Sequence, residues 1–168
     1  MHKAGKYIGD LVYGANDGII TTFAVVAGVA GAGLSPAIVV ILGISNLLAD
    51  GFSMAASNYL ARNSEKQYLE KIGIPEENKK NPLKNATATF VAFVIAGSIP
   101  LLPYILGIEG DIFLQAIVAT TITLFVVGSL RARITGMNWF RAGMEMLAIG
   151  ALAAFVAYII GKLLGNLI

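Results

Sequence analysis

The stretch DLVYGANDGIITTFAVVAGVAGAG, residues 10–33, decides the fold of this chain. It is long and apolar enough to cross a bilayer as an α-helix, yet it contains Asp17. A second such stretch, PAIVVILGISNLLADGFSMAASNYL at residues 36–60, contains Asp50. A carboxylate at the bilayer centre costs about 2.5–3.5 kcal/mol, so a span carries one for function rather than stability. The two aspartates, beside Met54, therefore indicate a path for cations.

The composition is typical of an integral membrane protein. Of the 168 residues, 57% are hydrophobic and 13% are charged, whereas a soluble domain carries about 25% charged residues. The chain has no cysteine, and its single histidine is His2, near the terminus. This excludes disulfides, thiolate sites and cysteine nucleophiles, and no Ser–Lys arrangement suggests a catalytic centre. We expect no enzyme activity, no catalytic or cofactor-binding residues and no nucleic-acid partner.

Hydrophobic runs of about 20 residues predict five transmembrane helices in one transmembrane domain covering residues 1–168. The expected spans are residues 11–33, 36–60, 86–106, 112–130 and 142–167. A tight turn is expected at Ala32–Pro36 and another at Gly107–Asp111. Pro100 and Pro103, in SIPLLPY, should kink or loosen the third span near one end.

The sizeable polar segment is residues 62–85, RNSEKQYLEKIGIPEENKKNPLKN. Its first part is expected to be a charged helix that ends at Gly73 and Pro75. Its second part, which contains Pro82, is expected to be an irregular linker back into the membrane. The segment is a short cytoplasmic loop in this interpretation.

The distribution of basic residues predicts the orientation. If the N-terminus is cytoplasmic, that side of the membrane holds eleven of the twelve Lys and Arg residues: Lys3, Lys6, Arg62, Lys66, Lys71, Lys79, Lys80, Lys84, Arg131, Arg133 and Arg141. The other side keeps Lys162. Five spans with the N-terminus inside and the C-terminus outside are therefore expected.

A polar stripe runs along the second expected span. Asn46, Asp50, Met54 and Asn58 recur at every fourth position, so they share one face of a helix. At 1.5 Å per residue, Met54 and Asp17 lie at a similar depth, roughly 10 Å from the cytoplasmic end. Gly14 and Gly18, beside Asp17, form a GxxxG pair that permits close approach by another helix.

The donor types of this stripe suit a divalent transition metal. Carboxylate and amide oxygens bind hard or borderline cations, and a thioether adds preference for softer ones, which favours Fe²⁺ or Mn²⁺ over Mg²⁺ or Ca²⁺. A buried carboxylate that binds either a proton or a metal links the two ions. That linkage is the physical basis of an antiporter.

Each candidate also has a purely structural interpretation. Met54 could fill a packing gap, and Asn46 and Asn58 could be interhelical hydrogen-bonding residues. Asp50 could pair with a base, although no Lys or Arg lies within the interior of any span, away from its ends. Glu145 could snorkel or pair with Arg141, four residues earlier. The loop glutamates, interleaved with lysines, could be a solvated helix face.

Three segments together resemble the vacuolar iron transporter family, with its nodulin-like and prokaryotic relatives. They are residues 10–33, SNLLADGFSMAASNYLARNSE at residues 45–65, and SIPLLPY at residues 98–104. The most specific elements are Asp17–Gly18, Ser53–Met54 and the proline pair. The resemblance covers nearly the whole chain.

This resemblance implies an all-α, five-span homodimer with its pore at the subunit interface, exporting Fe²⁺ and often Mn²⁺ from the cytosol in exchange for protons. It carries Asp17 and Met54 over as pore residues. Relatives have a glutamate where this chain has Asn46, so Asp50, one turn on, is expected to replace its charge. They also have a long cytoplasmic metal-collecting insertion, which is reduced here to the short loop. Glu65, Glu70, Glu76 and Glu77 are its candidate metal ligands.

Two alternatives remain open at the level of sequence. The chain could export another divalent metal, such as Co²⁺, Ni²⁺ or Zn²⁺, or it could be a non-transporting membrane sensor or scaffold that binds metal at its loop. Partners other than lipid, metal ions and a second copy are not expected, nor is a resident cofactor. The short loops favour a prokaryotic plasma membrane, with a vacuolar membrane as the eukaryotic counterpart.

Overall fold

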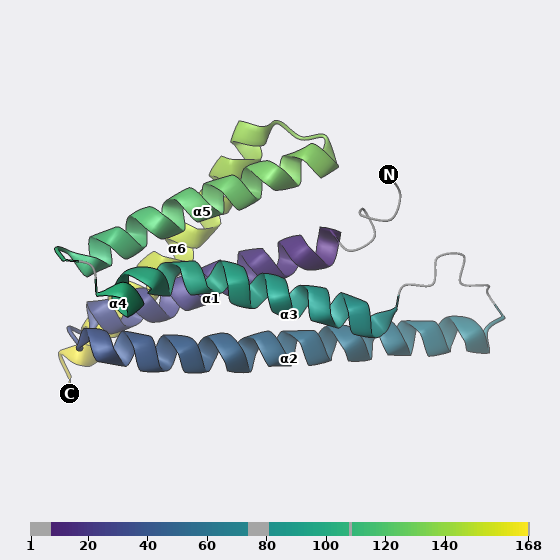
Figure 1. Ribbon diagram of the computed structural model, residues 1–168, viewed down its shortest axis with the longest axis horizontal. Helices are drawn as coiled ribbons and strands as arrows, with labels where there is room; N and C mark the ends of the chain where they lie inside the picture. Colours follow the sequence, from purple (N-terminus) through teal and green to yellow (C-terminus); the bar gives the residue numbers. More distant parts are fainter. Residues whose placement is uncertain (1–7, 74–80, 108, 168) are drawn as a thin grey trace.

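The computed structural model of the chain describes residues 8–73, 81–107 and 109–167, and within these ranges it is helical with no strand (Figure 1). The elements in chain order are α1 (Ile8–Gly31), α2 (Pro36–Lys71), α3 (Pro82–Ser98), the 3₁₀ turn η2 (Ile99–Leu101), α4 (Leu102–Leu106), α5 (Ile112–Thr135) and α6 (Trp139–Gly165).

Five helical stretches are long and apolar enough to cross a membrane, as the sequence predicted. They are Ile8–Gly31, Pro36–Lys71, Pro82–Leu106, Ile112–Arg133 and Trp139–Gly165. The third combines α3, η2 and α4, because the helix tightens to a 3₁₀ turn at Pro100 and resumes before Pro103. The expected loosening at the proline pair is confirmed.

The first part of the polar segment at residues 62–85 is a continuation of the second helix. α2 continues without a break to Lys71 and extends past the start of α3 at one end of the molecule (Figure 1). Ile72 caps the end of the helix, and Gly73 follows it. The φ of Gly73 is 71°, a conformation that glycine adopts readily. The prediction of a charged helix ending at Gly73 is therefore confirmed, and Pro75 lies outside the described residues.

The prediction that Pro82 belongs to an irregular linker is wrong. The side chain of Asn81 accepts hydrogen bonds from the backbone N–H groups of Leu83 and Lys84, which caps the helix. Pro82 occupies the first turn, where its missing N–H costs nothing. α3 therefore begins four residues before the expected start of the third span at Ala86.

α1 lies at the centre of the bundle and packs against α3 on one side and α6 on another (Figure 1). The backbones of α1 and α3 are in direct contact. A Cβ added at Gly14 would lie 2.5 Å from the carbonyl oxygen of Thr89, and a Cβ added at Gly18 would overlap the carbonyl oxygen of Phe93. The GxxxG pair therefore does permit close helix approach, but its partner is α3 of the same chain.

The outer faces of the bundle are apolar. Large side chains more than half exposed lie on α2, α3, α5 and α6, and include Ile41, Phe52, Ile95, Leu114 and Leu152. Exposed apolar surface on this scale is unfavourable in water and is expected where lipid or another subunit covers it. The fold is thus that of a helical membrane protein.

Candidate metal-binding groove

A groove of about 680 Å³ lies between α1 and α2 and collects most of the polar side chains predicted for the site. It is lined by Gly9, Asp10, Tyr13, Asp17, Asp50, Ser53, Met54, Ser57, Asn58, Ala61 and Arg62. The α2 residues recur every three or four positions, so one helix face supplies them. Asp17, Asp50 and Met54, predicted from sequence as ligands, thus share one cavity.

Asp17 and Asp50 are both half-buried. Among the described residues, the ion pairs involve neither of them. The hydroxyl of Thr21 donates to the main-chain carbonyl oxygen of Asp17, at 2.7 Å, rather than to its carboxylate. Both carboxylates therefore remain available to a cation in the groove.

Asn46 contacts the groove residue Asp50 rather than the groove itself. Its side-chain amide donates to Oδ2 of Asp50 at 2.8 Å, one helical turn away, and Asn46 does not itself line the groove. This contact orients one carboxylate oxygen and leaves the other free. The structure therefore places Asn46 as a residue that positions Asp50, and its direct coordination of a metal stays a prediction.

Asn58 uses its side-chain N–H groups between helices, whereas its Oδ1 is buried without a hydrogen-bond partner among the described residues. It donates to Asp10 Oδ1 of α1 and to Thr89 Oγ1 of α3, each at 2.9 Å. Asn85 of α3 donates to the other Asp10 oxygen, also at 2.9 Å. The interpretation of Asn58 as an interhelical hydrogen-bonding residue is confirmed.

Asp10 is the residue that sequence reasoning missed. It precedes the apolar run, yet it is only 7% exposed and forms the centre of a buried polar network joining α1, α2 and α3. One signal was present: Asp10 lies seven residues before Asp17, which is two helical turns, so the two share a face. Its partner Asn85, fully buried, lay in a segment expected to be a linker.

The loop glutamates within the described residues lie on the exposed extension of α2. Glu65 pairs with Arg62 at 3.3 Å, and Glu70 pairs with Lys66 at 3.8 Å. These contacts fit a solvated helix face, and metal docking there stays a prediction. Glu76 and Glu77 lie outside the described residues.

Glu145 of α6 pairs with Arg131 of α5. The alternative that it pairs with Arg141 on its own helix is therefore wrong. Arg131 and Glu145 come together because α5 and α6 are antiparallel neighbours joined by a short turn.

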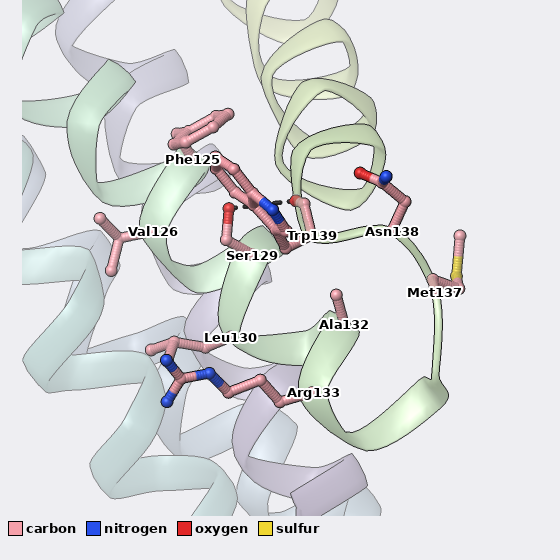
Figure 2. Close-up of a pocket in the computed structure, with 9 residues that line it drawn as sticks. All are labelled: Phe125, Val126, Ser129, Leu130, Ala132, Arg133, Met137, Asn138 and Trp139. Carbon is pink, nitrogen blue, oxygen red and sulfur yellow. Dashed lines mark hydrogen bonds between the residues drawn. The ribbon is translucent and has the colours of Figure 1, made fainter.

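A second pocket, of about 540 Å³, lies at the turn between α5 and α6 (Figure 2). Its lining is mainly apolar and aromatic, with Phe125 and Trp139 in edge-to-face contact, and the hydroxyl of Ser129 donates to the Trp139 carbonyl at 3.2 Å. Arg133 is the one charged residue among the described residues that line it. It offers a metal ion no carboxylate, so the groove between α1 and α2 is the better cation site.

Five membrane-length helices and a carboxylate-lined groove between the first two define a polytopic membrane protein with an intramembrane polar site. The chain matches the model of the VIT family over residues 8–73 and 69–162 and belongs to that family. The resemblance on the three sequence segments is thereby confirmed.

The chain is similar to proteins named vacuolar iron transporter along most of its length. It is 29% identical to the one from Toxoplasma gondii, covering 97% of this chain and 76% of that protein. It is 27% identical to vacuolar iron transporter 1 from Arabidopsis thaliana, over 95% of this chain and 86% of that one. It is 24% identical to the one from Plasmodium falciparum, over 93% and 81% respectively.

Proposed function

We propose that this protein exports a divalent transition metal, Fe²⁺ or Mn²⁺ or both, from the cytosol across its membrane in exchange for protons. One observation carries the proposal: Asp17 of α1 and Asp50 and Met54 of α2, far apart in sequence, line a single groove. The names of the relatives, vacuolar iron transporters, support metal transport. In this proposal Asp17 and Met54 are ligands, and Asp50, oriented by Asn46, is a third.

The donor set explains the choice of metal. Two carboxylates supply hard oxygens and one thioether supplies a soft donor, a mixture that suits borderline ions better than Mg²⁺ or Ca²⁺. Co²⁺, Ni²⁺ and Zn²⁺ share these preferences and are the alternative cargo. The carboxylates also supply proton coupling, because each binds either a proton or a share of the metal.

A homodimer would complete the site. Within residues 8–73, 81–107 and 109–167 of one chain, no group of three or more His, Asp or Glu side chains converges on a point that could hold a metal. A two-fold axis beside α1 would bring a second Asp17 and a second groove into register. The exposed apolar faces leave surface for such an interface.

The proposed orientation has the N-terminus in the cytosol. α1 begins, α2 ends and α5 ends at the same end of the bundle, which gathers Arg62, Lys66, Arg131 and Arg133 there, whereas Lys162 lies near the other end (Figure 1). The names of the relatives support a vacuolar-type membrane. They lend no support to the plasma membrane that the short loops favoured.

The test is flux in proteoliposomes that enclose a metal-sensitive dye and a pH-sensitive dye. We expect Fe²⁺ or Mn²⁺ uptake with opposite proton movement in the wild type, and loss of both in Asp17→Asn. Glu109→Gln, which removes an exposed carboxylate outside the groove, is the matched control and should transport normally. Flux that survives Asp17→Asn would contradict the assigned ligand. Absence of flux for every divalent ion in the wild type would favour a sensor.

A further inference from the structure

Among the described residues that line the groove, Arg62 is the one basic residue. Its guanidinium lies between two carboxylates: one nitrogen is 3.7 Å from Oδ1 of Asp10, and another is 3.3 Å from Oε2 of Glu65. Asp10 is buried on the groove side, whereas Glu65 is exposed on the extension of α2. Arg62 thus lies where the groove meets the solvent, with one anionic partner on each side.

Asp10 does not depend on Arg62 for its hydrogen bonds. Each of its carboxylate oxygens already accepts from an amide at 2.9 Å, one from Asn58 and one from Asn85. At 3.7 Å the Arg62 nitrogen is beyond hydrogen-bonding distance of Asp10, so the contact is mainly electrostatic. The side chain of Arg62 is also 35% exposed, and it donates its hydrogen bond to Glu65 rather than to the buried network.

We propose that Arg62 is a tethered cation that controls entry to the groove, and that an incoming metal ion displaces it from Asp10 towards Glu65. This inference rests on the proposed transport function. At the mouth of the groove, the guanidinium charge opposes every cation, and it opposes a divalent ion twice as strongly as a monovalent one. Asp17 and Asp50, deeper along the same two helices, supply the attraction that overcomes this repulsion. Arg62 therefore sets the concentration at which metal enters.

The experiment measures initial rates of metal flux in proteoliposomes of neutral lipid, over a range of Mn²⁺ concentrations, at low and at high salt. Arg62→Gln should lower the half-saturating Mn²⁺ concentration about three- to tenfold at low salt while leaving the maximal rate nearly unchanged. The shift should shrink at high salt, because screening weakens interactions between exposed charges. Arg62→Lys, which keeps the charge, should behave like the wild type.

Two further variants separate this role from a general effect of charge or of folding. Arg133→Gln removes a positive charge from the same end of the bundle but at the α5–α6 pocket, and should change nothing (Figure 2). Glu65→Gln removes the outer partner and holds Arg62 at Asp10, so it should raise the half-saturating concentration about two- to threefold. This rise should disappear when Glu65→Gln is combined with Arg62→Gln, whereas loss of a metal-docking carboxylate would raise the half-saturating concentration in both backgrounds. If Arg62→Gln fails to fold, Arg62→Leu takes its place.

The outcomes are distinct. Wild-type flux with an unchanged half-saturating concentration in Arg62→Gln would overturn the entry role and leave the transport function intact. A lower maximal rate with a lower melting temperature would make Arg62 a structural contact instead. Equal shifts in Arg62→Gln and Arg133→Gln would reduce the effect to surface charge. No flux in the wild type would remove the transport function, and the entry role with it.

Discussion

The carboxylate of Asp10 on α1 accepts a hydrogen bond from the side-chain amide of Asn85 on α3, at 2.9 Å, between two residues that are 7% and 0% exposed. The two residues are 75 positions apart, and Asn58 of α2 reaches the same carboxylate. A buried acceptor shared by three helices fixes their relative depth, because a shift of any one helix would leave a polar group without its partner.

Asp10→Ala should therefore destabilise the bundle. Removing the acceptor leaves the Asn85 amide buried and unpaired, at a cost of about 1–3 kcal/mol. Thermal unfolding in detergent measures the loss. Glu70→Ala, which breaks the exposed pair with Lys66, is the control and should cost no more than about 1 kcal/mol. Equal melting temperatures for the two variants would contradict the structural importance of the Asp10 network.

Gly18→Ala should impair folding more than its single added methyl group suggests. A Cβ at this position overlaps the backbone carbonyl of Phe93, and backbone cannot move aside as a flexible side chain can. We expect a loss of about 1–3 kcal/mol or more, seen as a lower melting temperature or loss of the monodisperse peak on size exclusion. Gly9→Ala, where a Cβ meets nothing within 4 Å, should be neutral or stabilising. A stable Gly18→Ala would contradict the close packing of α1 on α3.

Met54→Leu should change which metals the protein transports more than how fast it transports them. Leucine keeps the volume and the apolar character but lacks the thioether, so the groove retains oxygen donors alone. We expect preference for Fe²⁺ over Mg²⁺ to fall while the fold stays intact. Competition of Mg²⁺ with Fe²⁺ flux measures this. Unchanged competition would make Met54 a packing residue, the alternative interpretation of its place in the stripe.

A carboxylate placed one helical turn away from Asp50 on α2 should be able to replace it. Asn46 and Asp50 contact each other at 2.8 Å, so a carboxylate at either position reaches a common region. Asp50→Asn should lower metal flux, and Asn46→Glu added to it should restore flux at least in part. Rates in proteoliposomes test this pair. If the double variant is as inactive as Asp50→Asn, the charge is needed at position 50 itself.

The membrane spans could be predicted from the sequence, whereas the contacts between helices could not. All five spans followed from hydropathy, because a bilayer imposes length and apolarity on each helix independently of its neighbours. The loosening at Pro100 and Pro103 and the helix end at Gly73 followed from local stereochemistry. Pro82 was misplaced because its capping residue, Asn81, lies in a polar run that resembles a linker.

The candidate site was partly predictable for a similar reason. Asp17, Asp50 and Met54 could be singled out, because a carboxylate within an apolar run is costly and the helical repeat shows which residues share a face. That they line one groove between α1 and α2 depends on how the helices pack.

The sequence by itself determined that this chain is a five-span membrane protein, which helices carry its carboxylates, and which family it belongs to. Only the tertiary structure decided that Gly14 and Gly18 pack against α3, that Glu145 pairs with Arg131, and that Asp10 lies at the centre of a three-helix network. The physical reason is the sequence separation over which each kind of interaction acts. Hydropathy and helical periodicity act within about 20 residues, whereas these contacts join separate helices and depend on their rotation and depth.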